Sequence, residues 1–193
     1  MTYHSAGSGG AELRIRKMTA AALFLAIAMV LPLITGQIPE IGQMLCPMHI
    51  PVLLCGFMCG WPWGLAVGLT APLLRSAVFG MPPMFPEAAA MTFELAVYGA
   101  LSGILYSVLP RNKRAIYATL ITAMIAGRLV WGLARLAIAG LAGYEFTAAA
   151  FVAGAVTKAI PGIIMHIVLI PVLVMVMERE GMSLNPRRDR PAD

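Results

Sequence analysis

Charge is scarce in this sequence. Of its 193 residues only 12% are charged and 60% are hydrophobic, whereas a soluble domain usually carries about 25% charged residues. The composition therefore indicates an integral membrane protein and leaves little polar sequence for a separate soluble domain.

Cysteine is also rare, with Cys46, Cys55 and Cys59 as the three members. No CxxC pair occurs, so we expect neither a disulfide framework nor a zinc site. The fourteen methionines are scattered rather than clustered with cysteine or histidine, which favours apolar packing over soft-metal binding. The sequence predicts no metal site and no bound cofactor.

Several catalytic and ligand-binding motifs are absent from the sequence. The chain has no Gly-xxxx-Gly-Lys-Ser/Thr phosphate loop, so it cannot hydrolyse ATP by that route. An H-E-x-x-H metalloprotease motif is also absent. We see no basic patch interleaved with aromatic residues, and therefore no sign of nucleic-acid binding.

Six long apolar runs are present instead. They predict an all-α membrane bundle of six transmembrane helices, each needing roughly 20 residues to span. The first run follows a polar, basic start without a clear cleavage site, so we interpret it as a retained helix. The second and third are short and joined by Trp-Pro-Trp, and a five-span alternative with a re-entrant hairpin stays open. The predicted spans are Met18–Leu33, Met48–Gly60, Gly64–Phe79, Glu87–Leu109, Ala115–Leu141 and Ala148–Met177.

Positive charge predicts the orientation. Ten of the fourteen Lys and Arg residues lie before the first span, between the fourth and fifth, or after the sixth. With six spans these segments share one side, which the positive-inside rule identifies as the cytoplasm. We therefore expect a cytoplasmic tail over residues 1–17, a membrane domain over 18–177 and a second cytoplasmic tail over 178–193, with both termini inside.

The other four positive residues fall within the apolar runs. Charges inside a membrane usually face a bundle interior or a water-filled cavity. Helical periodicity places Arg128, Trp131 and Arg135 on one stripe. A second stripe holds Glu87, Met91, Glu94 and Tyr98, and a third holds Lys158, Gly162 and His166.

These groups predict a pocket that opens away from the cytosol. Counted against Glu94 alone, the positive residues are in excess, and an uncompensated buried cation favours an anionic ligand. His49, at the outer start of the second span, could reach that ligand, whereas His166 is expected near the inner side, about a bilayer away. The predicted substrate-binding residues are His49, Arg75, Glu94, Tyr98, Arg128, Trp131, Arg135 and Lys158.

Small residues indicate close helix packing. Gly56, Gly60, Gly64 and Gly68 recur every four residues, and Pro62 interrupts them, which predicts a tight hairpin whose glycines serve packing. Ala22 and Ala26 form a small-xxx-small face on the first span.

The string MHIPVLLCGFMCGWPWGLAVGLTAPLLRSAVFGMPPMFPEAAAMTFELAVYGALSG resembles the substrate-binding S components of energy-coupling factor (ECF) vitamin transporters. The resemblance extends over roughly Met18 to Met177. It implies a membrane subunit that captures a micronutrient from outside and joins a transmembrane coupling protein and two ABC ATPases. It also implies that Ala22 and Ala26 contact the coupling protein.

The HIPVLL and GMPP segments look most like the uncharacterised and pantothenate-type branch. Pantothenate is a carboxylate, but folate, biotin, lipoate and nicotinate are also anions, so charge does not choose among them. Two rivals stay open: a standalone carrier of a small organic anion, and an intramembrane enzyme using the glutamates and histidines.

Overall fold

The computed structural model describes residues 8–34, 44–110, 112–157 and 159–185, and every regular element within these ranges is helical. The prediction of an all-α protein is therefore confirmed for the described chain. The long helices are α1 (Ser8–Ile34), α4 (Trp61–Phe79), α5 (Ala89–Val108), α6 (Lys113–Ala142) and α8 (Ile160–Arg179). The shorter segments are α3 (His49–Cys59), η1 (Met84–Ala88), α7 (Ala148–Val152) and η2 (Ala153–Thr157).

Four stretches are long and apolar enough to cross a membrane, and they match the first, fourth, fifth and sixth predicted spans. These are Gly10–Ile34, Met84–Val108, Lys113–Ala142 and Ala148–Arg179. The second predicted span corresponds to α3, which is apolar but has only 11 residues. At about 1.5 Å per residue, α3 is too short to cross a bilayer alone. The third predicted span corresponds to α4, which is not among the four stretches.

The predicted hairpin lies between α3 and α4. α3 ends at Cys59, Gly60 turns the chain with φ +95°, and α4 begins at Trp61. Pro62 stands in the first turn of α4, where its missing N–H leaves no hydrogen bond unmade. A Cβ atom added at Gly64 would overlap the backbone of Gly99 on α5. The packing role predicted for the glycines is therefore confirmed.

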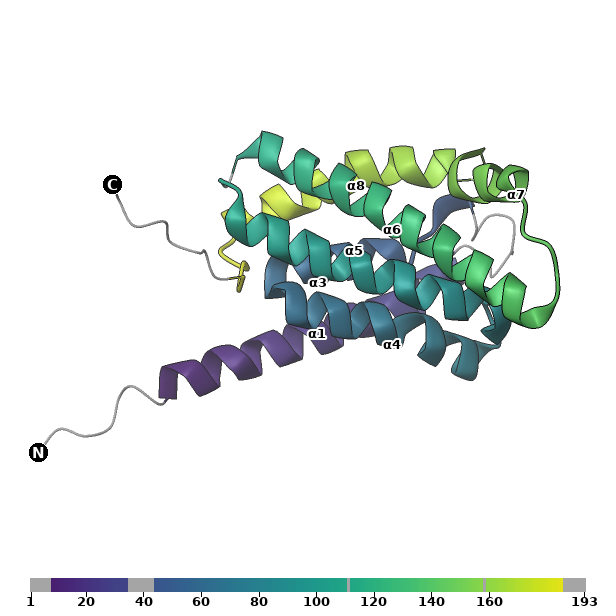
Figure 1. Ribbon diagram of the computed structural model, residues 1–193. Helices are drawn as coiled ribbons and strands as arrows, with labels where there is room; N and C mark the ends of the chain where they lie inside the picture. The colour runs from purple at the N-terminus through teal and green to yellow at the C-terminus, as the bar shows by residue number, and fades with distance from the viewer. Residues whose placement is uncertain (1–7, 35–43, 111, 158, 186–193) are drawn as a thin grey trace, which may run out of the picture.

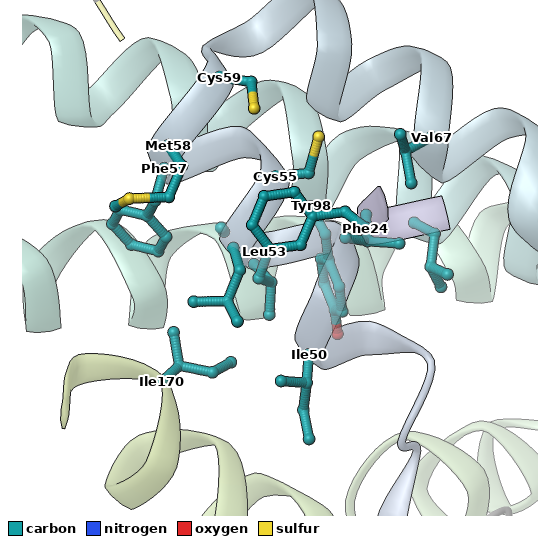
Figure 2. Close-up of a cluster of buried hydrophobic side chains, with 14 of the residues drawn as sticks. Phe24, Ile50, Leu53, Cys55, Phe57, Met58, Cys59, Val67, Tyr98 and Ile170 are labelled. Carbon is teal, nitrogen blue, oxygen red and sulfur yellow. The ribbon is translucent and has the colours of Figure 1, made fainter. Parts of the chain in front are cut away.

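The core surrounds α3, of which every residue is buried. α5 packs against α3, α4 and α6, and α1 covers α3 with a face that includes Ala21, Phe24 and Ala28. Figure 2 shows the side chains of this cluster, with Phe24 and Leu53 among those labelled. Since α3 is enclosed by the longer helices, its first turn can hold a polar side chain away from lipid.

The start of α1, the α3–α4 turn and the end of α8 lie at the same end of the bundle (Figure 1). There a surface groove joins Arg14 and Lys17 of α1 to Pro62 and Trp63 of α4. Asn185, which follows α8, donates from its side chain to the carbonyl of Gly103 at 3.2 Å. Arg14 and Lys17 of α1 therefore lie at the same end of the bundle as Arg179, the last residue of α8. The side of the membrane that this end faces, and the domain boundaries, stay predictions.

The sixth predicted span is not one continuous helix. α7 and η2 come first, a turn lies at Ala159, and α8 begins at Ile160 with Pro161 in its first turn. Lys158, predicted to bind substrate, lies outside the described residues. This interruption changes the depth of every residue that follows it.

Candidate functional site

Two ion pairs reach α6. One comes from α5, and the other comes from η1, the segment that precedes α5. Arg128 Nη1 lies 3.0 Å from Glu94 Oε1, and Arg135 Nη1 lies 2.8 Å from Glu87 Oε1. The pairs are seven residues apart on each side of an antiparallel contact, which corresponds to roughly 10 Å along the helices. The two polar stripes expected on these segments therefore face each other.

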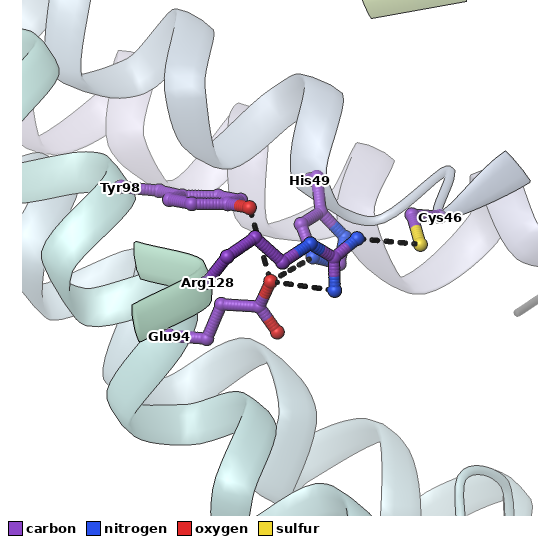
Figure 3. A network of polar contacts seen from close by, with 5 residues as sticks. All are labelled: Cys46, His49, Glu94, Tyr98 and Arg128. Atoms are coloured by element: carbon purple, nitrogen blue, oxygen red, sulfur yellow. Dashed lines mark hydrogen bonds and ion pairs between the residues drawn. The ribbon is translucent and has the colours of Figure 1, made fainter. Parts of the chain in front are cut away.

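We call Glu94–Arg128 the inner pair and Glu87–Arg135 the outer pair. The inner pair belongs to a buried network (Figure 3). Glu94 Oε1 accepts a hydrogen bond from the Tyr98 hydroxyl at 3.0 Å, and His49 Nε2 lies 3.3 Å from the same oxygen. His49, Glu94 and Tyr98 are each 1% exposed, while the Arg128 side chain is 16% exposed. The structure thus joins four of the predicted residues, from α3, α5 and α6, around one carboxylate oxygen.

Cys46 is a member of this network that the sequence did not single out. Its Sγ lies 3.6 Å from Nη2 of Arg128, and its φ of +47° is unusual for a residue other than glycine. The segment before it presses on α8, where a Cβ at Gly162 would come within 2.5 Å of the Met44 carbonyl oxygen. Cys46 therefore sits where the chain entering α3 meets α6 and α8.

His166 also belongs here, contrary to expectation. Its ring stacks on that of His49 with centroids 5.8 Å apart and an interplanar angle of 24°. The prediction that these histidines lie about a bilayer apart is wrong. It counted depth from Ala148, whereas α8 begins at Ile160, which puts His166 only about 9 Å along that helix. Pro161 was the available signal, because proline favours the first turn of a helix. The distance between the histidines is consequently no longer a reason against an enzyme.

The outer pair lies in an aromatic setting. The Arg135 guanidinium carbon is 5.4 Å from the centre of the Phe146 ring and 5.9 Å from that of Trp131. Phe151 stacks on Trp131 with centroids 6.3 Å apart. Glu87 is 33% exposed and Arg135 15%. The carboxylate of the outer pair is therefore more exposed to solvent than that of the inner pair. Phe146 and Phe151 had not been predicted as neighbours of the site.

Arg75 is placed apart from both pairs. It is 2% exposed, donates to the Met29 backbone carbonyl of α1, and lies 5.1 Å from the centre of the Phe79 ring. It forms no ion pair within the part of the chain that the structure describes. The structure therefore puts Arg75 at the contact of α1 with α4 and does not join it to Glu94.

The charge balance differs from the one expected. Glu87 compensates Arg135 as Glu94 compensates Arg128, and the expectation had counted Glu94 alone. Among the described residues, Arg75 is the buried arginine left without a carboxylate. The excess of positive charge in the bundle is consequently smaller than the sequence suggested.

The first helix presents Ala22 and Ala26 outward. Both alanines are exposed, and so are their neighbours Leu23 and Ile27, whereas Ala21 and Phe24 face the core. The small-residue face of α1 is therefore uncovered by the rest of the described chain.

Within the described residues, no three His, Cys, Asp or Glu side chains are arranged to hold a metal ion.

A family model described as "ECF transporter, substrate-specific component" matches residues 16–174. Neither the curated proteins nor the solved structures yielded a match. The family match extends from the basic start of α1 to within α8, and so includes both ion pairs and the stacked histidines. Proteins of this family are the substrate-binding subunits of transporters and not enzymes. The chain belongs to the ECF transporter substrate-specific component family.

Proposed function

We propose that this chain captures a small vitamin for an ECF-type ABC importer, in a pocket that opens away from the cytosol. The observation that carries this proposal is the network around Glu94, where polar side chains from α3, α5 and α6 meet inside an otherwise apolar bundle. Polar and ionisable groups are expensive inside a membrane and usually mark a substrate path.

The binding residues we propose form three groups. His49, Glu94, Tyr98 and Arg128 form the inner wall around one carboxylate. Further along α6 from Arg128, Trp131 supplies an aromatic platform about one turn away and Arg135 supplies a cation about two turns away. Arg75 and Lys158 complete the set, and for Lys158 the proposal rests on sequence alone. A few polar groups in a mostly apolar lining are typical of small-molecule sites.

We propose an anionic ligand such as pantothenate. Arg75 supports this choice, because it is buried and has no carboxylate partner among the described residues. A carboxylate ligand would supply the missing counter-charge. The resemblance to the pantothenate-type branch in the HIPVLL and GMPP segments favours pantothenate over the other anionic vitamins.

The partners we propose are the transmembrane coupling protein and two ABC ATPases. Ala22 and Ala26 would meet the coupling protein, since small residues allow two helices in lipid to approach closely. The chain itself has no phosphate loop, so the energy for uptake comes from the ATPases. We place the protein in the prokaryotic cytoplasmic membrane, with the basic end of the bundle in the cytosol.

Mass spectrometry of small molecules that copurify with the detergent-solubilised protein tests the capture function. We expect one vitamin at close to one molecule per chain. We expect Arg135→Ala to weaken its binding at least tenfold, whereas Arg114→Ala, at the other end of α6, leaves affinity unchanged. Equal affinity of both variants would contradict the placement of the pocket. Absence of any bound vitamin, with no binding from a vitamin panel, would contradict the function.

The partner surface has its own test. Ala22→Trp combined with Ala26→Trp should preserve vitamin binding and abolish copurification with the coupling protein. The matched control is Ile164→Trp, which also adds bulk to an exposed apolar position, on α8. Copurification unaffected by the α1 substitutions would exclude this surface. Uptake by the chain alone, driven by an ion gradient, would favour the standalone carrier.

A further inference from the structure

Three buried histidine nitrogens in and beside the Glu94 network make no hydrogen bond within the described residues: both ring nitrogens of His49, and Nε2 of His166. Nε2 of His49 still lies 3.3 Å from Glu94 Oε1, which leaves Nδ1 of His49 and Nε2 of His166 without a polar partner in this part of the chain. The two side chains are 1% and 2% exposed, and their rings stack at 5.8 Å. A buried polar atom without a partner costs about 1–3 kcal/mol, so two in neighbouring rings require an explanation.

The proton of His166 can be placed from its contacts. Its ring forms a hydrogen bond with the backbone of Cys46, and Nε2 has no partner in the described chain. The nitrogen facing Cys46 is therefore Nδ1, and a backbone carbonyl requires a donor there. In a neutral imidazole the other nitrogen is then an acceptor. Nε2 of His166 carries a free lone pair.

His49 presents one of its ring nitrogens to Glu94. Its Nε2 lies 3.3 Å from the carboxylate oxygen Oε1 of Glu94, which favours a proton on that nitrogen. With the imidazole proton on Nε2, the nitrogen that faces this carboxylate, Nδ1 is an unused acceptor.

We infer that His49 and His166 together recognise hydrogen-bond donors, such as hydroxyl or amide N–H groups, on the captured molecule. This inference rests on the proposed function and deepens it. An anionic group of the ligand would be bound by a guanidinium, whereas these imidazoles can offer only lone pairs. The vitamin is therefore one that carries donor groups apart from its carboxylate, and a simple aromatic acid is disfavoured.

Nitrogen NMR of the full-length protein in lipid nanodiscs, labelled with ¹⁵N-histidine, tests the inference. The chain has three histidines, so His166→Phe and His49→Phe assign the signals and His4 is the internal reference. The free protein should show unprotonated Nε2 in His166 and unprotonated Nδ1 in His49. The probes are pantothenate, biotin, folate, lipoate and nicotinate, and the one that binds should shift both signals.

Affinity measurements with the same probe complete the test. His166→Phe keeps a stacked ring but removes the acceptor, and should weaken binding at least tenfold. His166→Gln offers a carbonyl acceptor and should restore part of the affinity. A phenylalanine variant that binds like the parent protein, or a protonated Nε2 in free His166, would overturn the inference.

The remaining outcomes separate the two proposals. Binding that leaves both nitrogen signals unmoved overturns only the role of the histidines, while the capture function stands. No binding by any probe overturns both. A transition metal present at one per chain in the purified protein would also overturn the inference, because the lone pairs would then be metal ligands.

Discussion

The two Glu–Arg pairs use the same residue types on the same two faces, yet their surroundings differ. In the inner pair Glu94 is 1% exposed and Arg128 16%, whereas in the outer pair Glu87 is 33% exposed and Arg135 15%. Glu94 has three polar neighbours on one oxygen. Arg135 instead combines one carboxylate with the Trp131 and Phe146 rings.

This difference separates an interaction that the fold depends on from one that can open. Removing one partner of a buried pair leaves an uncompensated charge and costs about 3–5 kcal/mol. The outer pair differs in its carboxylate, because water reaches Glu87 and can replace it beside Arg135, and pairs open to water contribute about 0–1 kcal/mol. We therefore expect the inner pair to fix the arrangement of α5 and α6, and the outer pair to exchange partners when a ligand enters.

The largest effect is expected from Glu94→Gln. This isosteric change removes the negative charge beside Arg128 and should lower the free energy of unfolding by about 3–5 kcal/mol. The matched change Glu87→Gln should lower it by less than about 1 kcal/mol. Thermal unfolding of both purified variants in the same detergent makes the comparison.

Equal losses in the two variants would contradict the distinction between the pairs. A double variant, Glu94→Gln with Arg128→Met, controls for charge, because replacing a whole buried pair with uncharged groups is far less costly than breaking it. It should recover most of the stability lost in Glu94→Gln.

Tyr98→Phe should have the next largest effect. Its hydroxyl donates to Glu94 at 3.0 Å from a position that is 1% exposed. A hydrogen bond to a charged group contributes about 1.5–3 kcal/mol, and the loss should appear in the same unfolding measurement. Tyr117→Phe, on an exposed part of α6, is the control and should be neutral. A neutral Tyr98→Phe would show that Arg128 and His49 suffice to hold the carboxylate.

Much of this arrangement could be predicted from sequence, because it follows from helical periodicity. Residue spacing alone places Arg128, Trp131 and Arg135 on one stripe, and Glu87, Glu94 and Tyr98 on another. In the structure these two stripes face each other. The turn at Gly60 was similarly visible in the glycine spacing and Pro62.

Pairings and depths could not be predicted in the same way, since they depend on where helices begin and how they register. Glu87 was seen but not matched to Arg135, because nothing local fixes the register of two antiparallel helices. The start of α8 at Ile160 places His166 beside His49. Pro161 was the one local signal of that start, because the hydrophobic periodicity continues through the apolar run. Phe146 and Phe151 lie outside any polar pattern, so only tertiary packing brings them to Trp131.

Adding a methyl group at Gly127 or Gly132 of α6 should lower the stability by an intermediate amount and so compare the inner and outer regions. A Cβ at Gly127 would overlap the ring of Tyr98, which is 1% exposed and held by Glu94. A Cβ at Gly132 would overlap the ring of Phe151, which belongs to the five-residue helix α7. Gly127→Ala should therefore cost about 1–3 kcal/mol through overpacking, and Gly132→Ala clearly less, as measured by thermal unfolding. A larger loss for Gly132→Ala would show that the outer region is the more rigid one.

The smallest effect is expected from the outer pair itself, in a double-mutant cycle with Glu87→Gln and Arg135→Gln. The coupling free energy should be below about 1 kcal/mol, because Glu87 is exposed enough for water and salt to screen the pair. Raising the salt concentration from about 0.1 M to about 1 M shortens the screening length from about 10 Å to about 3 Å, so the coupling should shrink further. The inner pair, with Glu94 shielded from solvent, should keep its coupling under the same change. A salt-insensitive outer pair would mean that Trp131 and Phe146 seal it from water, and it would then be as permanent a part of the fold as the inner pair.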